Sequence, residues 1–256
     1  NALVYASRSR AFKSGGFFGG FATSAAQLDP YNEETITAFE VGFKTDWPEQ
    51  NIRLNGSAYY YDRNGVQANG IDTTELVPIS RLINAGNAES YGAELDMVWT
   101  PTENLIFRVN TAYVHSKITE SNAVTADIFS ATTSTFTGTR FPNQPEFSSS
   151  LITRYEMDIA NDLNAGIQLE ITYKGDHDLR MIVIPQESAL LRENGYALVN
   201  LRADLGNLDE NWKISAFVTN IFKKEYRSVI ANDTLGGIYE TYGEPRNWGI
   251  KLNYKF

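Results

Sequence analysis

The sequence predicts an all-β fold, an antiparallel transmembrane β-barrel to which this chain contributes about ten strands. Alternation of apolar and polar residues recurs about ten times, whereas helical periodicity is nearly absent. The alternating segments run for about 10 to 14 residues, longer than the ~5–6 residues usual in globular proteins. Short turns and long polar loops also follow one another in strict alternation. These three observations together favour a barrel.

Composition excludes several classes of protein. The chain has 256 residues, with 22 Lys and Arg against 31 Asp and Glu, for a net charge of −9. This balance argues against a nucleic-acid partner, because nucleic-acid binders usually carry a basic face. With no cysteine, disulfides, thiolate metal sites and thiol nucleophiles are excluded. No apolar run approaches the ~18 residues of a transmembrane helix.

The strand expectations come from period-2 patterns. In "LNAGIQLEITYK" (163–174), the residues at odd positions are apolar or aromatic and those at even positions are mostly polar. The phrases "TAFEVGFKTDW", "SYGAELDMVW" and "FSSSLITRYEMD" repeat this pattern. The predicted strands are 2–12, 34–47, 51–64, 81–100, 104–118, 146–158, 162–174, 195–206, 210–222 and 246–256.

The connections alternate in length. Short turns are expected at 48–50, 101–103, 159–161 and 207–209, and each is followed by a long loop. A soluble meander has no reason to keep all its long loops at one end. The long loops lie near 13–33, 65–80, 119–145, 175–194 and 223–245.

Apolar and polar residues alternate along the strands of both a soluble sandwich and a membrane barrel. The residues on the polar face of each strand therefore decide between the two. Charged residues occur in mid-strand, such as Glu40, Glu94, Arg154 and Asp204, and their mixed signs indicate ion pairs across a wet lumen. Only closure removes the unpaired strand edges that lipid cannot satisfy. Aromatic residues gather near strand ends, as an interfacial girdle requires; they are Tyr5, Trp47, Tyr60, Trp99, Tyr113, Tyr155, Tyr173, Trp212 and Trp248.

Several phrases resemble the C-terminal half of TonB-dependent outer-membrane transporters. They are spread along the chain in family order: "YASRSRAFKSGGF" (5–17), "YNEETITAFEVGFKTDW" (31–47), "LINAGNAESYGAELDMVWTPTENL" (82–105), "VTNIFKKEYR" (218–227) and "YGEPRNWGIKLNYKF" (242–256). The resemblance implies a 22-stranded barrel around an N-terminal plug, in the outer membrane of a Gram-negative bacterium. Such a receptor takes up a scarce ligand with energy passed from the inner membrane.

The resemblance also sets expectations about organisation and partners. Residues 1–256 contain no plug and no energy-coupling box, and Asn1 opens in a strand-like run, so we expect a C-terminal barrel fragment whose long loops are extracellular. The implied partners are outer-membrane lipid and lipopolysaccharide, the missing plug and barrel strands, the TonB energy-coupling complex and the barrel-assembly machinery. No cofactor is expected. An iron chelate, either siderophore or haem, is the first expectation for the ligand; cobalamin, saccharides and other metals stay open.

The candidate ligand-binding residues are Arg and aromatic side chains on the outer loops and the upper lumen. Arg forks suit carboxylate or catecholate oxygens, and aromatic rings supply rigid apolar contact. The alternative is that these side chains serve loop solubility or contact lipopolysaccharide. The candidates are Arg10, Phe12, Phe17, Phe18, Tyr61, Arg63, Arg81, Arg140, Phe141, Tyr226, Arg227, Tyr239, Tyr242 and Arg246.

The final strand resembles a terminal assembly signal read by the assembly machinery. Its pattern consists of Gly249, Leu252, Tyr254 and the last residue, Phe256. The chain could instead simply close the sheet there, and both roles are compatible.

Catalytic and metal-binding patterns are weak, so neither an enzyme nor a metal site is predicted. "GDHD" (175–178) reads as a solvated polar loop rather than a metal site, and His115 and His177 are far apart in the sequence. Two rival interpretations stay open. One is a complete ten-stranded outer-membrane protease, for which only Asp176, His177 and Asp178 approach the required constellation. The other is a soluble extracellular β-sandwich adhesin.

Overall fold

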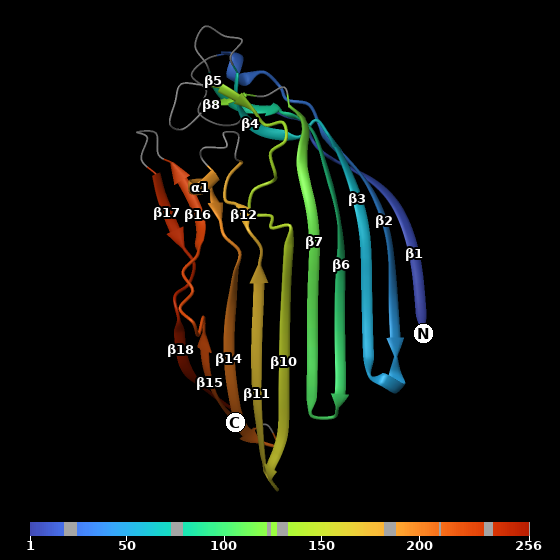
Figure 1. Cartoon of the computed structure of the whole chain (residues 1–256), viewed down its shortest axis with the longest axis vertical. Helices are drawn as coiled ribbons and strands as arrows, with labels where there is room; N and C mark the ends of the chain where they lie inside the picture. The colour runs from blue at the N-terminus through green and yellow to red at the C-terminus, as the bar shows by residue number, and fades with distance from the viewer. Residues whose placement is uncertain are drawn as a thin grey trace.

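Ten strands form one continuous antiparallel sheet in a computed structural model of the chain (Figure 1). The structure describes residues 1–17, 25–72, 79–121, 124–126, 133–181, 188–209, 211–232 and 238–255. Each strand of the large sheet pairs with the one before it in the chain, apart from short strands in the connections. In sheet order they are β1 (Ala2–Lys13), β2 (Glu34–Trp47), β3 (Ile52–Asn64), β6 (Gly86–Thr102), β7 (Leu105–Ser121), β10 (Phe147–Ala160), β11 (Leu163–Lys174), β14 (Tyr196–Asn207), β15 (Trp212–Thr219) and β18 (Asn247–Tyr254).

Two predicted strand boundaries are wrong, each for a local reason. The strand expected at 81–100 is two strands, because Ala85 is fully buried and Gly86 has a φ of 134°, which turns the chain between them. The strand expected to reach residue 222 ends at Thr219. Asn220 follows with a φ of 48°, and its side-chain amide donates to the carbonyl oxygens of Lys224 and Glu244. The Asn220 side chain therefore replaces the sheet as hydrogen-bond partner.

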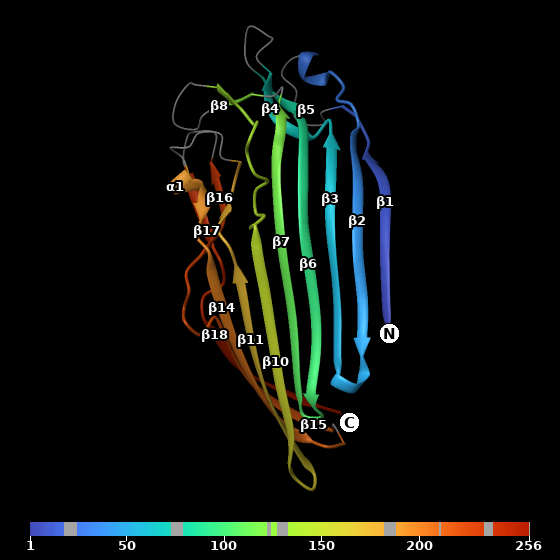
Figure 2. The same cartoon turned by 45° about the vertical axis from the view of Figure 1, so that its right-hand side comes forward.

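The connections differ in length at the two ends of the sheet. Tight turns close β2–β3, β6–β7, β10–β11 and β14–β15 at one end, and the first contains the 3-10 helix η2 (Pro48–Gln50). The long connections lie at the opposite end, which we call the long-loop end (Figure 2). Among the described residues, no helix has the length and apolar character to cross a membrane.

The long connections have structure of their own, where the sequence predicted only loops. Four short strands from two connections form one sheet, and two pairs form hairpin-like ladders. The sheet contains β5 (Ile79–Asn84), β4 (Gln67–Asp72), β8 (Val124–Ala126) and β9 (Thr133–Thr135). The ladders are β12 (His177–Asp178) with β13 (Arg192–Glu193), and β16 (Arg227–Asn232) with β17 (Ile238–Tyr242). Two short helices complete this end, η1 (Ala25–Leu28) and α1 (Ser188–Leu191).

Two small apolar clusters hold the long-loop end together. Ala85, Ile118 and Phe136 are buried against one another at the top of β7. Leu179, Leu191 and Ile230 form the second cluster, between the connections that follow β11 and β15. Burial of apolar side chains thus joins segments that are far apart in the sequence.

The large sheet has an apolar face and a polar face. Strand register aligns Phe43, Gly56, Leu95 and Thr111 on the apolar face. The girdle assignment of Tyr5 is wrong, because Tyr5 pairs with Gly42 on the polar face, where its hydroxyl donates to Glu40 Oε1 at 2.6 Å. Gly42 allows this placement, since a Cβ there would lie 2.5 Å from the Tyr5 hydroxyl oxygen.

Aromatic residues on the apolar face lie in two rows that cross the strands. The upper row, nearer the long-loop end, contains Phe39, Tyr60, Tyr91 and His115 at matching register positions. The lower row contains Trp47, Ile52, Trp99 and Phe107, and the rings of Trp99 and Phe107 stack at 5.4 Å. Such rows are typical of the two interfaces of a membrane barrel.

Candidate functional site

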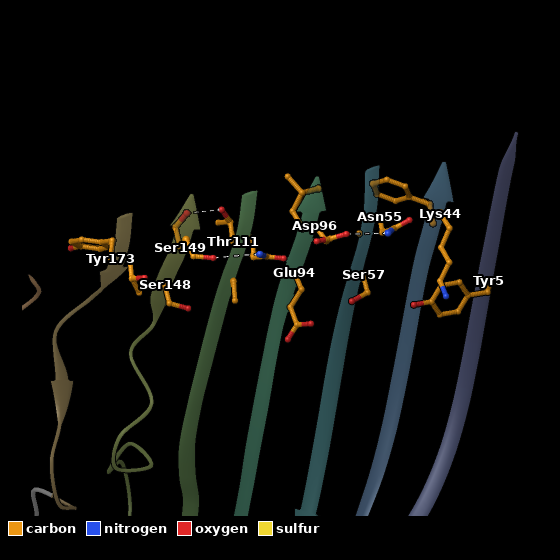
Figure 3. Close-up of a pocket in the computed structure, with 17 residues that line it drawn as sticks. Tyr5, Lys44, Asn55, Ser57, Glu94, Asp96, Thr111, Ser148, Ser149 and Tyr173 are labelled. Atoms are coloured by element: carbon orange, nitrogen blue, oxygen red, sulfur yellow. Dashed lines mark hydrogen bonds between the residues drawn. The ribbon is translucent and has the colours of Figure 1, made fainter. Parts of the chain in front are cut away.

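The polar face of the sheet carries separate side-chain hydrogen bonds between neighbouring strands (Figure 3). Asn55 donates to Asp96 at 3.2 Å, and Asn110 donates to the Ser150 hydroxyl at 3.4 Å. These residues line a shallow hollow that runs from β1 to β11. The lining on the polar face includes Tyr5, Lys44, Ser57, Glu94 and Ser148. The face is therefore polar in its own right, as a wet lumen requires.

An ion pair crosses the same face from β10 to β14, and a hydrogen bond extends it to β15. Arg154 Nη1 donates to Asp204 Oδ2 at 2.8 Å, and Arg202 Nε donates to Asp204 Oδ1 at 2.8 Å. Arg202 also donates to the Ser215 hydroxyl at 3.0 Å. Asp204 is thus held by two guanidinium groups, and only 4% of its side chain is exposed. Of the mid-strand charges named above, Arg154 and Asp204 form an ion pair, whereas Glu40 accepts a hydrogen bond from the Tyr5 hydroxyl.

Arg63 and Phe141, two predicted site residues, meet at the long-loop end. Arg63 lies on the polar face of β3, and its guanidinium carbon is 5.3 Å from the centroid of the Phe141 ring. This distance is typical of a cation–π contact. Arg63 Nε is buried and has no hydrogen-bond partner within the described part of the chain. Tyr61 lies two residues away on the same face and stacks on Tyr59 at 4.7 Å.

The segment from 136 to 146 brings Phe141 to this place. It runs beside the upper part of β7, where the Ile118 amide donates to the Thr139 carbonyl at 2.9 Å and the Ser116 hydroxyl donates to Gln144 at 2.5 Å. Phe141 reaches β3 past β6 and β7, the two strands between them in the sheet. Backbone and side-chain hydrogen bonds to β7 therefore hold the segment that carries the Phe141 ring.

Arg140 lies next to Phe141 and faces acidic groups. Its Nη1 is 3.8 Å from Glu146 and 3.9 Å from Asp176, both at the outer limit for an ion pair. His115 Nδ1 is closer to Glu146, at 2.8 Å. Arg140 therefore forms only long ion pairs, whereas the shorter contact of Glu146 is with His115.

Arg227, also a predicted site residue, is instead the centre of a loop network. Its guanidinium donates to Glu193 at 2.8 Å, to Glu240 at 3.0 Å and to the carbonyl oxygens of Leu190 and Arg192. The bonds from Glu193 and then Glu240 raise the pKa of Arg227, and Arg227 in turn lowers the pKa of Glu240. The donors of Arg227 are thus engaged in joining two loops.

The remaining predicted residues lie apart from Arg63. Tyr226 stacks on Tyr196 at 4.5 Å. Arg10 and Phe12 lie on the apolar face of β1, because each is an odd number of positions from Tyr5, which lies on the polar face. Exposed positions hold Phe17, Tyr239, Tyr242 and Arg246. Phe18 and Phe256 lie outside the described residues, and the same holds for the side chain of Arg81.

Three residues of the "GDHD" segment are buried and only Asp176 is exposed, so its prediction as a solvated loop is wrong. His177 is 1% exposed and Asp178 3% exposed. Nδ1 of His177 donates to the Gly175 carbonyl at 2.9 Å, and Asp178 accepts from Arg192 Nε at 2.8 Å. The described part of the chain contains no group of three or more His, Asp or Glu side chains arranged to hold a metal ion.

Comparison with known proteins settles the family. The profile of the "TonB dependent receptor-like, beta-barrel" family matches residues 1–221. The chain belongs to this family. Proteins of the TonB-dependent receptor family lie in the outer membrane of Gram-negative bacteria, and this is the location of the present chain. The polar face therefore lines the barrel lumen, and the apolar face contacts lipid.

Solved structures of TonB-dependent receptors have the same fold. The ferric yersiniabactin uptake receptor FyuA from Yersinia pestis matches with a TM-score of 0.77 and 18% identity, over 100% of this chain and 35% of its own. The siderophore receptor PiuA from Acinetobacter baumannii matches with a TM-score of 0.73 and 19% identity, over 100% and 34%. The copper transporter OprC matches with a TM-score of 0.67 and 16% identity, over 100% and 37%. The chain thus spans about a third of the length of these receptors.

Tyr59 was not among the predicted site residues. Tyr59 shares its strand face with Tyr61 and Arg63, so the period-2 rule applied to 51–64 would have grouped all three. The position of Phe141 against Arg63 had no comparable signal, because it depends on the path of an irregular segment.

Proposed function

We propose that this chain forms part of the wall and the outer loops of a receptor for energy-coupled uptake of a ferric chelate. Membership of the TonB-dependent receptor family supports the uptake role. The single observation that supports an anionic ligand is Arg63, whose guanidinium is positioned on Phe141 while its Nε has no partner in the described residues. An Arg held in this way can donate to carboxylate or catecholate oxygens.

The neighbouring aromatic rings fit the same class of ligand. Phe141 presents a flat apolar surface to the Arg63 guanidinium, and Tyr59 and Tyr61 stack on each other on the same face of β3. Two of the solved structures with this fold are receptors named for siderophores, and one is named as a copper transporter. We therefore place a ferric siderophore first among the ligands and treat copper as an outcome of the test.

The long-loop end is proposed to face the exterior of the cell. The loops near 13–33, 65–80, 119–145, 175–194 and 223–245 would then be extracellular, and Arg63 would lie near the outer mouth of the lumen. This chain contains no cysteine, so the labelling of a cysteine introduced into it is compared with that of the unsubstituted receptor. Thr137→Cys, at the long-loop end, should react with a membrane-impermeant maleimide on intact cells, whereas Glu103→Cys, in a short turn, should not. The reverse pattern would contradict the orientation.

The remaining proposals concern partners. A plug and the other barrel strands would complete the receptor, the TonB complex would energise it, and lipopolysaccharide would surround it. Gly249, Leu252, Tyr254 and Phe256 would form the signal read by the barrel-assembly machinery.

The uptake proposal is tested in cells whose only such receptor is the intact protein that contains this chain. Ferric catecholate, ferric hydroxamate and free copper are supplied in turn, each with a radioactive metal. We expect uptake of a ferric chelate, and a loss of about tenfold or more in Arg63→Gln, because a charged hydrogen bond contributes about 1.5–3 kcal/mol. Arg108→Gln, the same change on the lumen face of β7 near its short-turn end, is the control. Uptake of copper alone, or equal uptake by the two variants, would contradict the proposal.

A further inference from the structure

Two arginines lie on the lipid-facing side of β1. Arg8 and Arg10 alternate with Tyr5 and Ser7 on the lumen side, so they share the face of Val4 and of Phe39 on β2. Both are exposed. The Arg8 guanidinium carbon lies 5.8 Å from the centroid of the Phe39 ring. Across the described residues, neither arginine has an acidic side chain within ion-pair distance.

The strand register fixes the height of these two arginines relative to the aromatic rows. Arg8 pairs with Phe39, and that position continues through Tyr60 and Tyr91 to His115, which is the upper aromatic row. An aromatic row of this kind marks the boundary between acyl chains and headgroups. Arg8 therefore lies at that boundary, and Arg10 lies one register step farther out, where headgroups are.

The charged residues at the level of Arg10 do not neutralise it. That level contains Asp62, Glu89 and Lys117. Glu89 and Lys117 pair with each other at 3.0 Å. Asp62 is two strands from Arg10 and accepts a bond of 3.3 Å from Asn64. Among the described residues, Arg8 and Arg10 therefore have no acidic neighbour at these levels on the lipid-facing side of β1 or β2.

An apolar groove lies directly below the aromatic row. Most of its lining comes from two lipid-facing register rows on β1, β2, β3, β6 and β7, with Gly42, Ser57 and Glu94 from the row between them. The lining is almost wholly apolar and includes Val4, Val41, Phe43, Ala58, Ala93, Leu95 and Tyr113. The groove is on the lipid-facing side, so the occupant with access to it is an acyl chain.

We propose that this surface is a binding site for a phosphorylated glycolipid of the outer leaflet, with phosphate on Arg8 and Arg10 and an acyl chain in the groove. Guanidinium forks suit phosphate oxygens, and long Arg side chains extend from a lipid-facing strand toward the headgroups. The site is independent of the ligand that the lumen takes up, but it rests on the orientation proposed above. Maleimide labelling of Thr137→Cys tests that orientation separately.

The test uses the intact receptor purified in mild detergent, with lipopolysaccharide as the probe. Native mass spectrometry measures the lipid that stays bound. We expect Arg8→Gln combined with Arg10→Gln to lower retention by about tenfold or more, whereas Arg108→Gln on the lumen face leaves it unchanged. Ala93→Phe, which fills the groove, should lower retention while leaving both arginines in place.

A second measurement needs no variant. Wild-type receptor stripped of lipid is titrated with lipopolysaccharide, with its dephosphorylated form and with phosphatidylglycerol. We expect lipopolysaccharide to bind most tightly, and loss of phosphate to weaken binding by about tenfold. Equal binding of the dephosphorylated form, or preference for phosphatidylglycerol, would overturn the proposal.

Discussion

Arg154 on β10 reaches Asp204 on β14 across the intervening strand β11, with a hydrogen bond of 2.8 Å. The guanidinium passes over Gly166, where a Cβ would lie 2.7 Å from Arg154 Nη2. Asp204 is nearly buried, whereas Glu156, the other acidic partner of Arg154, has 49% of its side chain exposed. One cation thus has two acidic partners in very different surroundings.

We expect the two partners to differ sharply in their contribution to stability. Asp204→Asn should lower the free energy of unfolding by roughly 3 kcal/mol, because it leaves two guanidinium groups without their buried counter-charge. Glu156→Gln should cost less than about 1 kcal/mol, as exposed ion pairs do. Denaturant unfolding of the intact receptor in detergent measures both. Equal effects would show that burial of Asp204 does not govern the network.

A second prediction concerns Gly249 and Phe217, which are register partners on β18 and β15. A Cβ at Gly249 would lie 2.8 Å from Phe217 Cζ, so the ring lies against the glycine. Gly249→Val should destabilise the receptor by about 1–3 kcal/mol through overpacking. Adding Phe217→Ala should recover part of this loss. A thermal shift of the two single variants and the double variant tests the pair, with Lys251→Gln as a same-face control. Additive losses would contradict a direct clash.

A third prediction concerns the loop network of Arg227. Arg227→Lys keeps the charge but loses the planar fork that serves Glu193, Glu240 and two carbonyl oxygens. We expect the loops after β11 and β15 to be cleaved by added protease about tenfold faster, with little change in barrel unfolding. Arg246→Lys, at an exposed position of the same region, should have no such effect. Unchanged cleavage would show that other contacts hold these loops.

A fourth prediction concerns pH. Burial lowers the pKa of His177 from its ordinary value of 6.5, against the opposing effect of its bond to the Gly175 carbonyl. Nearby Lys174 also lowers this pKa, whereas Glu193 and Asp176 raise it. Since the folded pKa lies below the unfolded one, His177 stabilises the loop fully above about pH 6.5, and this stability falls as pH drops below that value.

The readout is protease sensitivity of the loop at about pH 7.5 and at about pH 5, either side of the ordinary His range. Wild type should become more sensitive at the lower pH, and His177→Gln should show a smaller change. A wild-type loop that is equally resistant at both values would contradict the prediction.

Strand positions in the large sheet were predictable because period-2 patterns persist over 8 to 17 residues. The split at Ala85 and Gly86 was not, since it follows from a buried cluster formed with Phe136, far along the chain. The short strands β8, β9, β12 and β13 have two or three residues each, too few for a period-2 pattern to be recognised in the sequence. Their pairing depends on tertiary contacts.

The candidate site was predictable in type but not in arrangement. Arg63 and Tyr61 followed from their position at the end of a strand, and Phe141 from its place beside Arg140. Phe141, rather than a residue nearer in the sequence, contacts Arg63. This contact depends on hydrogen bonds between the 136–146 segment and β7. Residue type alone also could not show that Arg227 would be engaged by Glu193 and Glu240, because their approach requires the folded loops.

The two aromatic rows also set the hydrophobic thickness to which this wall is matched. Corresponding members lie eight positions apart on four strands (39 to 47, 52 to 60, 91 to 99 and 107 to 115). At about 3.4 Å per residue the span is about 27 Å along the strand. A tilt of about 40° reduces it to about 21 Å across the bilayer. A wall of this height avoids mismatch in a thin membrane such as the bacterial outer membrane, and would be too short for a thicker sterol-rich one.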